Sequence, residues 1–296
     1  MKLEKIITLA NEPVRIRFLA MERSLRAVGC DLPLLVIPYD DRLFDLPPNA
    51  TWWTTPLRDW LLGEKAHRMM FKYQCLTTTN YQYVDSDVVF LRDPAKVLEN
   101  ESGFIASCGH WRETEETVEP KSLAILKARS TNWQRNVFNA GQFACNRALY
   151  TDETLKQTCL DPRYVETCLR FPYNDQPGLV LLANLAGVPI HNLTLPPNFM
   201  ESTWAEDYDE VDYEDYWRDE AKKPYLIHWA GCDMWLPRKI DSLFTQYFTP
   251  DELAEWTKFV AQQKARETKA RSTLGHRVRR LKHGARAFSA AIEDFD

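Results

Sequence analysis

The N-terminal residues show blocks of apolar and polar positions that predict a strand, a helix and a second strand. Residues 6–10 form an apolar run, and Pro13 then suits the first turn of a helix. Gly29 ends this helix, whose apolar side chains recur at helical spacing at Val14, Phe18, Met21, Leu25 and Val28. Residues 34–38 are a continuous apolar run, which is typical of a strand buried on both faces.

A strand, a helix and a strand in this order form a βαβ unit, which requires a parallel sheet and a right-handed crossover. Ligands of such sheets bind beyond the carboxyl ends of the strands, where Ala10 and Asn11 are expected to lie. The pattern Gly-x-Gly-x-x-Gly does not follow the first strand, and a dinucleotide cofactor is therefore not expected.

The rest of the chain continues the alternation of strands and helices. Further strands are predicted at residues 81–90, 103–108, 137–145, 188–193 and 225–231. Helices are predicted at residues 66–76, 152–170, 178–186 and 250–263, and loops at residues 40–56 and 201–220. This pattern favours an α/β fold with a mostly parallel central sheet flanked by helices, in a domain of residues 1–248. Residues 249–296 are expected to form a helical, basic C-terminal extension.

Composition and charge narrow the class of protein. Hydrophobic residues make up 45% of the 296 residues, which is enough for a sizeable core. The formal net charge of -5 excludes a nucleic-acid binder that acts by bulk electrostatics. No apolar run reaches the roughly 18 residues of a membrane span, and the start lacks the apolar run of a signal peptide. The cysteines are scattered without a Cys-x-x-Cys pair, which favours reduced thiols in a cytoplasmic protein.

Two carboxylates interrupt the apolar run at residues 81–90. Ionised Asp85 and Asp87 do not suit a buried strand unless they are paired or bind a cation. Residues two apart on a strand point to the same side, so both carboxylates could face one cation. Their hard oxygen atoms suit Mg²⁺ or Mn²⁺. The alternative is a strand end with two solvated carboxylates, because turns are rich in aspartate.

Polar residues also interrupt two later apolar stretches. Asn139 and Gly141 lie where a strand needs a close backbone approach or a special turn, and a simple β-bulge is the alternative. Asp175 and Gln176 precede an apolar run whose proline suits the first turn of a helix. Asp175 or the neighbouring Asn174 is therefore expected to cap that helix, and a capping residue can also belong to a binding site.

A histidine ends the apolar run at residues 225–229. His228 is followed by Gly231, which allows a turn directly after the strand. A single histidine in such a place is more often a structural residue than a metal ligand. Its interpretation as a ligand therefore depends on the segments that accompany it.

These segments resemble the motifs of GT-A glycosyltransferases, and the family 8-like group most closely. Residues 83–88, Tyr-Val-Asp-Ser-Asp-Val, resemble the metal-binding Asp-x-Asp motif. Residues 138–141, Phe-Asn-Ala-Gly, resemble the element whose asparagine binds the donor sugar. Asp175 and Gln176 resemble the Asp-Gln pair near the anomeric carbon. Residues 228–231 resemble the His-x-x-Gly motif, whose histidine is the third protein ligand of the metal.

The resemblance implies a GT-A, Rossmann-like fold and a divalent cofactor, Mn²⁺ or Mg²⁺. The implied metal ligands are Asp85, Asp87 and His228. The implied catalytic positions, which orient the donor sugar, are Asn139, Asp175 and Gln176. The implied contacts to the rest of the donor are Ala10, Asn11, Lys72, Asp85, Ser86, Gly141 and Gly231.

The resemblance is incomplete after Gly231. Family 8-like enzymes continue to Lys-Pro-Trp, whose lysine contacts the diphosphate, whereas residues 232–235 of this chain read Cys-Asp-Met-Trp. Arg238 or Lys239 is the expected substitute for that lysine. Lys72, on the predicted helix before the Asp-x-Asp motif, is a further cation expected to face the diphosphate, and a solvated helix face is the alternative.

The expected activity is transfer of a sugar from a nucleoside diphosphate sugar, with a UDP-sugar favoured, to a hydroxyl of a glycan or glycoconjugate. The resemblance favours a retaining hexosyltransferase, whereas an inverting enzyme would need a carboxylate base, for which Asp175 is the candidate. A sugar nucleotidyltransferase is disfavoured because no glycine-rich, basic loop follows the first strand. A metal-dependent phosphoester hydrolase and a non-catalytic carbohydrate-binding protein are the remaining alternatives.

Basic residues are concentrated in the C-terminal extension, in contrast to the acidic chain as a whole. They are Lys264, Arg266, Lys269, Arg271, Arg277, Arg279, Arg280, Lys282 and Arg286. This tail could contact an anionic membrane surface or an anionic glycan, or it could form a solvated helix. The expected location is cytoplasmic, with peripheral contact to the inner face of a membrane as an option.

Overall fold

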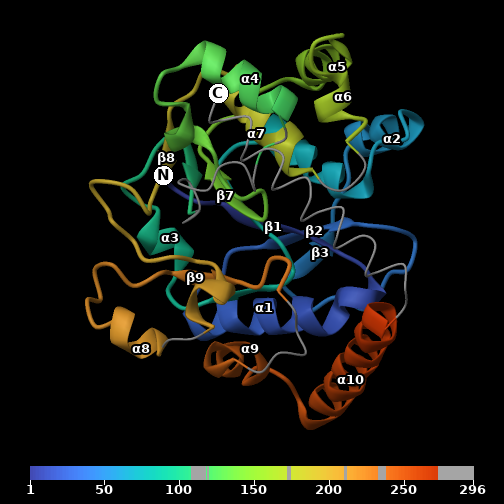
Figure 1. Ribbon diagram of the computed structural model, residues 1–296, viewed down its shortest axis with the longest axis vertical. Coiled ribbons are helices and arrows are strands. Elements are labelled where there is room, and N and C mark those ends of the chain that lie inside the picture. The colour runs from blue at the N-terminus through green and yellow to red at the C-terminus, as the bar shows by residue number, and fades with distance from the viewer. Residues whose placement is uncertain (108–117, 119, 172–174, 210–211, 233–237, 273–296) are drawn as a thin grey trace. The chain divides into compact units, whose positions relative to one another are not determined.

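The computed structural model describes the chain except for residues 108–117, 119, 172–174, 210–211, 233–237 and 273–296. The chain divides into two compact units, and Figure 1 shows its helices and strands in chain order from blue to red. The first consists of Met1–Cys232 and Arg238–Tyr247, and the second consists of Asp233–Pro237 and Phe248–Asp296. The division predicted from the sequence, between residues 248 and 249, stays a prediction.

A seven-stranded sheet organises the first unit, with its strands in the order β3-β2-β1-β4-β7-β6-β8. The strands are β1 (Lys5–Ala10), β2 (Leu34–Pro38), β3 (Ala50–Trp52), β4 (Tyr81–Val84), β6 (Phe104–Ala106), β7 (Gln142–Cys145) and β8 (Ile190–Asn192). β3, β2, β1 and β4 are parallel to one another, as are β6 and β8. β7 runs antiparallel to β4 and β6. The predicted α/β fold with a mostly parallel central sheet is therefore confirmed.

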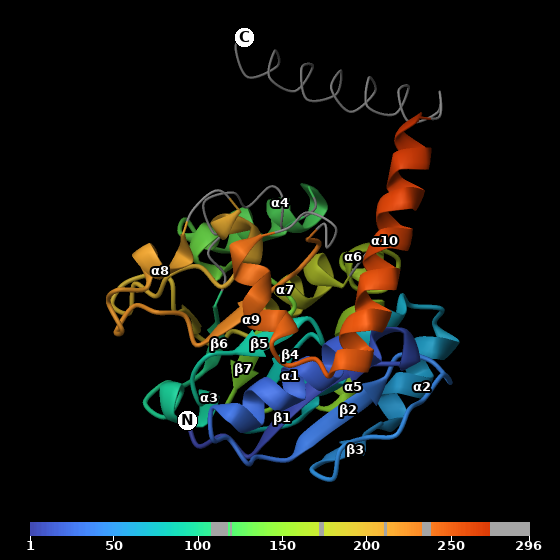
Figure 2. The ribbon, with the colours of Figure 1, turned by 90° about the horizontal axis from the view of Figure 1, so that it is seen from below.

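The predicted βαβ unit is present at the N-terminus. The short 3₁₀-helix η1 (Glu12–Val14) and α1 (Arg15–Ala27) connect the parallel strands β1 and β2, which lie side by side with β3 in Figure 2. The helix ends before Gly29, whose φ of 82° lies in the left-handed region that favours glycine.

The side chains of β1 alternate between two hydrophobic clusters, one on each face of the sheet. Ile6 belongs to the cluster that contains Phe18 and Met21 of α1. Ile7 belongs to the cluster that contains Met70 of η2 (Arg68–Thr77) and Leu179 of α7 (Gln176–Leu185). Helices therefore cover both faces of the sheet, with α1 below it and α7 above it in the view of Figure 1.

Further helices complete the first unit. They are α2 (Pro56–Gly63), α3 (Pro94–Val97), α4 (Pro120–Arg129), α5 (Asp152–Leu160), α6 (Val165–Cys168), α8 (Tyr213–Tyr216) and α9 (Ser242–Thr245). Short 3₁₀-helices are η4 (Trp133–Asn136), η5 (Ala205–Tyr208) and η6 (Lys239–Asp241). The helix predicted at residues 66–76 corresponds to the 3₁₀-helix η2, and the helix predicted at residues 152–170 is divided into α5 and α6.

The structure corrects the prediction of one strand at residues 81–90. β4 ends at Val84, and Val88–Phe90 form a separate strand, β5, outside the main sheet. β5 pairs antiparallel with β9 (Leu226–His228) in a two-stranded sheet of its own. Residues 85–87 therefore lie in the connection between two sheets and not within a strand.

Two stretches predicted as loops contain regular elements. β3 lies within residues 40–56, at one edge of the sheet beside β2. Residues 201–220 contain η5 and α8, and their Tyr208, Tyr213 and Trp217 are buried against one another. The prediction of a loop at residues 201–220 is therefore wrong for these three aromatic residues, whereas Tyr216 is 50% exposed.

The described cysteines are free thiols, and all of them are buried. They are Cys30, Cys75, Cys145, Cys159, Cys168 and Cys232. The remaining cysteine of the sequence, Cys108, lies outside the described residues.

The described part of the second unit contains α10 (Pro250–Ser272), which is longer than the helix predicted at residues 250–263. Trp256 packs against Phe248 and Phe259, with ring centroids 5.6 and 5.3 Å apart. The basic residues after Ser272 lie outside the described residues, so their contact with a membrane stays a prediction. Among the described helices, none combines the length and apolar character that a membrane crossing requires.

Gly178, in the first turn of α7, lies where the fold leaves no room for a side chain. A Cβ atom there would lie 2.0 Å from the Tyr73 hydroxyl and 3.1 Å from the Thr167 carbonyl oxygen. Tyr73 is fully buried and donates a hydrogen bond of 3.2 Å to the Cys168 carbonyl, so it cannot move aside without losing contacts. We expect Gly178→Ala to lower the free energy of unfolding by about 1–3 kcal/mol, measured by urea denaturation.

Gly63→Ala is the matched control, because Gly63 also lies in a helix, at the end of α2. Nothing lies within 4 Å of a Cβ atom added at Gly63. Alanine is the better helix former, so this variant should be as stable as the wild type or more stable by up to about 1 kcal/mol. Equal effects of the two substitutions would contradict the tight packing around Gly178.

Candidate functional site

A pocket of about 370 Å³ lies at the carboxyl edge of the sheet, where β1, β2 and β4 end. Its walls come from the end of β1, the start of α1, the residues after β2 and the connection between β4 and β5. The predicted site residues that line it are Ala10, Asn11, Asp85, Ser86 and Asp87. This position agrees with the expectation that ligands bind beyond the carboxyl ends of parallel strands.

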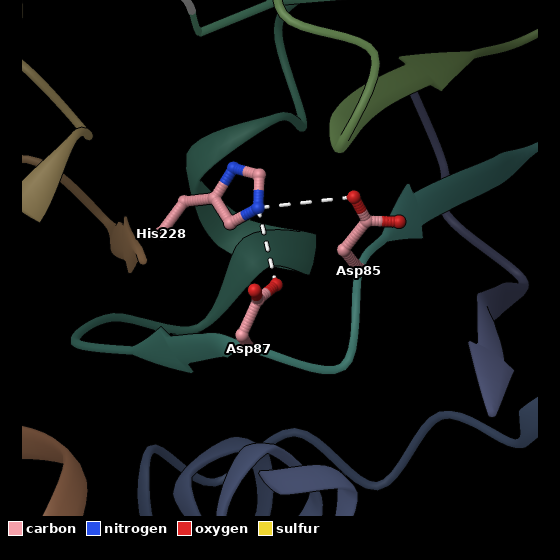
Figure 3. Close-up of side chains that lie close together, drawn as sticks. All are labelled: Asp85, Asp87 and His228. Atoms are coloured by element: carbon pink, nitrogen blue, oxygen red, sulfur yellow. Dashed lines mark ion pairs between the residues drawn. The ribbon is translucent and has the colours of Figure 1, made fainter. Parts of the chain in front are cut away.

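Asp85, Asp87 and His228 come together beside this pocket (Figure 3). The Nε2 atom of His228 lies 3.2 Å from Asp87 Oδ1 and 3.8 Å from Asp85 Oδ2. Ligand atoms of the three side chains all lie within 4.8 Å of one another. The structure thus brings the three predicted metal ligands into one cluster.

The pairing of β5 with β9 creates this cluster. Val88 of β5 lies opposite His228 of β9, so Asp87 precedes one paired strand and His228 ends the other. The His228 amide donates a hydrogen bond of 2.7 Å to the Thr203 carbonyl, and the Trp229 amide donates one of 3.0 Å to the Asp87 carbonyl. The side chain of His228 is only 2% exposed, so its imidazole is held against the carboxylates.

Asp87 has a positive partner on the side away from His228. The Nη1 atom of Arg17, on α1, lies 3.6 Å from Asp87 Oδ2, whereas Oδ1 faces His228. Burial raises the pKa of Asp87, but its interactions with His228 and with the charge of Arg17 outweigh burial and hold the pKa below its usual range. Asp87 is therefore ionised at neutral pH.

Asp85 is oriented by two donors that bind the same oxygen. The Tyr83 hydroxyl donates a hydrogen bond of 2.6 Å to Asp85 Oδ1, and Lys72 Nζ donates one of 3.1 Å to the same atom. Asp85 Oδ2 is the oxygen that faces His228. Outer contacts of this kind fix the direction of a metal-binding carboxylate.

Gly141 allows the backbone before β7 to approach the cluster. Its carbonyl accepts a hydrogen bond of 2.8 Å from the Asp85 amide. A Cβ atom at Gly141 would lie 2.1 Å from His228 Cε1 and 2.5 Å from Asp85 Oδ2. The predicted close backbone approach at this glycine is therefore present, and any larger residue would push two cluster side chains apart.

Lys72 does not line the pocket, although it was predicted to face a diphosphate there. It is fully buried, and its Nζ atom lies 2.9 Å from Asp175 Oδ2 and 3.1 Å from Asp85 Oδ1. Nζ also donates a hydrogen bond of 3.2 Å to the Ala140 carbonyl. Burial lowers the pKa of Lys72, but the two carboxylates outweigh burial and raise the pKa above its usual range. The charge of Lys72 is therefore compensated by Asp85 and Asp175, and it links the segments that carry them.

Asp175 lies at the N-cap position of α7, but its side chain makes no capping hydrogen bond, which contradicts the predicted capping role. The side chain is 4% exposed and forms the ion pair with Lys72 instead. A buried ammonium group needs a nearby carboxylate more than a helix end needs a cap. The other candidate cap, Asn174, lies outside the described residues.

Gln176 and Asn139 both bind the backbone of the turn that precedes β7. Gln176 Oε1 accepts a hydrogen bond of 3.2 Å from the Ala140 amide. Asn139 Oδ1 accepts one of 2.8 Å from the Gly141 amide. Both residues therefore shape the turn that carries Gly141, and their roles in orienting a donor sugar stay predictions.

The pocket also has polar lining residues outside the cluster. Asn11 Nδ2 donates a hydrogen bond of 2.8 Å to Asp40 Oδ2, and Arg42 Nε donates one of 3.0 Å to the same oxygen. The hydrogen bond from Arg42 is the main cause that lowers the pKa of Asp40 to about 2.

Gly231, a predicted donor contact, adopts a φ of 67° in the turn after β9 and is not among the residues that line the pocket.

Arg238 and Lys239, the expected substitutes for the diphosphate-binding lysine, are paired with carboxylates in the structure. Arg238 pairs with Asp209 and with Glu206, and Lys239 pairs with Asp212 and with Glu214. Both cations are held by the acidic segment around η5 and α8, because these carboxylates are their nearest opposite charges. Neither cation lines the pocket.

The residues that line the pocket without having been predicted as site residues include Arg17, Tyr39 and Arg42. For Arg17 a signal existed in the sequence. It lies in the first turn of α1, where the helix dipole disfavours a cation, so its presence needs another reason. Tyr39 and Arg42 follow β2 and carry no local signal beyond their place after a buried strand.

The chain has the GT-A fold that the resemblance implied. Its structure matches that of the galactosyltransferase LgtC in complex with donor and acceptor sugar analogues, with a TM-score of 0.54 and 14% sequence identity over 85% of this chain and 99% of that chain. An active-site mutant of LgtC gives a TM-score of 0.55 and 13% identity over 84% of this chain and 98% of that chain.

A second glycosyltransferase shares the fold. The apo structure of the bifunctional glycosyltransferase WbbM matches with a TM-score of 0.56 and 15% identity over 86% of this chain. The match covers 51% of WbbM, so this chain spans about half the length of that protein. No family model and no curated protein sequence matches this sequence. At these identities the structural similarity establishes the fold and leaves the activity to the site.

The cluster of Asp85, Asp87 and His228 suits a divalent metal ion. Two carboxylates supply hard oxygen atoms, which Mn²⁺ and Mg²⁺ prefer, and the imidazole adds a nitrogen ligand. Tyr83 and Lys72 hold Asp85 from behind, as outer contacts do in metal sites. The residues present therefore fit a divalent cofactor, whose identity the geometry leaves open.

Gly141→Ala should weaken metal binding without unfolding the protein. The added methyl group would displace His228 and Asp85, and displaced ligands typically reduce metal affinity roughly 10–100-fold. Titration of Mn²⁺, followed by the electron paramagnetic resonance of the free ion, measures this affinity. Gly63→Ala is again the control and should bind Mn²⁺ as the wild type does. Unchanged affinity in Gly141→Ala would show that the close approach is not needed.

Lys72→Met should destabilise the protein strongly. The substitution leaves Asp85 and Asp175 near one another without their shared cation, and the loss of one partner from a buried ion pair costs about 3–5 kcal/mol. Urea denaturation measures this loss. Adding Asp175→Asn should recover part of the stability, because it removes one uncompensated carboxylate. A double variant no more stable than Lys72→Met would refute this account.

Proposed function

We propose that the protein is a metal-dependent glycosyltransferase that moves a sugar from a nucleoside diphosphate sugar to an acceptor hydroxyl. The observation that carries this proposal is the joint position of the pocket and the metal-binding cluster at the carboxyl edge of a GT-A sheet. A nucleoside in the pocket would bring its diphosphate beside Asp85 and Asp87, which line the same pocket. Two ionised carboxylates repel a diphosphate unless a cation lies between them.

Asp85, Asp87 and His228 are the proposed ligands of that cation. A bound divalent ion would act as a Lewis acid that stabilises the negative charge on the leaving diphosphate. Mn²⁺ is favoured over Mg²⁺, because His228 adds a nitrogen ligand to the two carboxylates and Mg²⁺ prefers oxygen alone.

The sugar end of the donor is assigned to Asn139, Asp175 and Gln176, in a positioning role. Asp175 is almost fully buried and its Oδ2 atom is paired with Lys72, so it is poorly placed to reach an acceptor hydroxyl as a general base. This pairing supports the retaining outcome that the family 8-like resemblance implied. The proposed enzyme is therefore a retaining hexosyltransferase.

The classes of donor and acceptor come from the similar structures and from the resemblance. LgtC is a galactosyltransferase whose structure contains donor and acceptor sugar analogues, and we carry these two ligand classes to this chain. A UDP-sugar is the favoured donor, and a glycan or glycoconjugate is the favoured acceptor. A cytoplasmic location with peripheral membrane contact through the basic C-terminal tail completes the proposal.

Nucleotide binding that depends on both metal and cluster tests this proposal. The unfolding midpoint is measured with UDP, GDP and CDP, each with and without Mn²⁺. A ligand that binds only the native state stabilises it by about 2.7 kcal/mol at a hundredfold excess over its dissociation constant. We expect one nucleotide to raise the midpoint only with Mn²⁺, and Asp87→Asn to abolish this effect, because the substitution removes a charged ligand.

Asp59→Asn is the control for the loss of a carboxylate, because the Asp59 side chain is 82% exposed on α2. It should respond to the nucleotide as the wild type does. Release of the same nucleotide from its sugar donor, faster with a glycan acceptor, would then establish transfer. If no nucleotide shifts the midpoint of the wild type, phosphoester hydrolysis or metal-free carbohydrate binding becomes the better interpretation.

A further inference from the structure

The net charge of the site depends on one cation, Arg17, to which the proposed function assigns no role. The cluster and its ion-pair partners contain three carboxylates (Asp85, Asp87 and Asp175) and two cations (Lys72 and Arg17), so together they carry one negative charge when His228 is neutral. A divalent ion makes this balance positive by one charge, and without Arg17 it would be zero. The net attraction for an anionic ligand therefore depends on Arg17.

Few cations of the described chain reach the pocket. Those that line it are Arg17 and Arg42. The guanidinium group of Arg42 donates hydrogen bonds of 3.0 Å from Nε and 2.5 Å from Nη2 to Asp40 Oδ2, so its charge is already compensated. Lys72 is enclosed between two carboxylates and does not line the pocket.

The guanidinium group of Arg17 lies near the cluster, but its N–H donors are not used in hydrogen bonds to the cluster. Its Nη1 atom lies 3.6 Å from Asp87 Oδ2, which is an ion pair beyond hydrogen-bonding distance. Its side chain is 26% exposed, and it makes no hydrogen bond to the residues that the structure describes. A guanidinium group has five N–H donors and can bind phosphate oxygens in pairs, so Arg17 retains its donors for a ligand in the pocket.

The start of α1 adds to this preference for an anion. Pro13 and Val14, directly before the helix, line the pocket. The 3₁₀-helix η1 runs directly into α1, so the Arg15 amide bonds to the Glu12 carbonyl and the Val14 amide to the Asn11 carbonyl. The dipole of the helix still favours an anion at this end, and a cation there is unfavourable unless an anion is near.

From the position, the available donors and the helix end, we propose that Arg17 binds the diphosphate of the donor in this pocket. The inference rests on the proposed function and assigns to α1 the role that the sequence analysis gave to Arg238 or Lys239. It also makes Arg17 a competitor of the metal ion, because both are drawn to Asp87. Loss of Arg17 should therefore weaken nucleotide binding without weakening metal binding.

The experiment compares wild type, Arg17→Ala and Arg17→Lys with three probes, each measured by calorimetry at fixed salt. The probes are Mn²⁺ alone, the nucleosides uridine, guanosine and cytidine, and the matching nucleoside diphosphates with Mn²⁺. For the diphosphate that the wild type binds, we expect Arg17→Ala to weaken binding roughly ten- to a hundredfold, the value of one or two charged hydrogen bonds. Arg17→Lys should lie between, because an ammonium group keeps the charge but cannot form the paired contacts.

The two other probes separate diphosphate binding from a structural role. Affinity of Arg17→Ala for Mn²⁺ alone should be equal to or higher than that of the wild type, because a competing cation is removed. Affinity for the nucleoside should change by less than about twofold, within the usual effect of a surface substitution. A purely structural role would instead weaken all three probes together.

Arg15→Ala is the matched control. Arg15 lies in the same turn of α1 but pairs with Glu12 at 3.1 Å and does not line the pocket. It should leave all three affinities unchanged. Diphosphate affinity unchanged in Arg17→Ala would overturn the inference while the glycosyltransferase proposal stands. A wild type that binds Mn²⁺ but no nucleoside diphosphate would overturn both.

Discussion

A buried positive charge holds together the segments that make the site. Lys72, on η2, places its ammonium group between Asp85, Asp175 and the Ala140 carbonyl. These partners belong to the connection after β4, the start of α7 and the turn before β7. An ammonium group in the protein interior costs several kcal/mol unless its partners are well placed. The four segments therefore cannot shift independently, and Asp85 is left with one carboxylate oxygen for other ligands.

The same demand for partners explains why part of the site could be predicted. Carboxylates and a histidine inside apolar runs have to meet a partner or a cation, and Asp85, Asp87 and His228 do meet in one cluster. The parallel part of the sheet was also predictable, because continuous apolar runs around an amphipathic helix report burial on both faces. Gly141 was recognised for a different reason, because a glycine inside an apolar run marks a close approach of the backbone.

Long-range pairing could not be predicted from local pattern. β5 leaves the main sheet because it pairs with β9, which is far away in the sequence, and no periodicity within residues 81–90 records that partner. The roles of the cations could not be predicted for the same reason. The sequence offers Lys72, Arg238 and Lys239 as equivalent cations, but the carboxylates that take up each of them come from distant segments. Asp175 was wrongly predicted to cap a helix, because the local sequence does not show its ion-pair partner, Lys72.

β9 lies far after β5 in the sequence, which affects the order in which the parts of the site can form during synthesis. The walls of the pocket come from residues up to Asp87, whereas the third member of the cluster is His228. During synthesis the N-terminal part emerges first, so the pocket can form while two carboxylates still face water. The cluster is complete only when β9 pairs with β5 and brings the imidazole beside the carboxylates. The complete cluster is thus a property of the finished chain, and a polypeptide that ends before β9 lacks its imidazole.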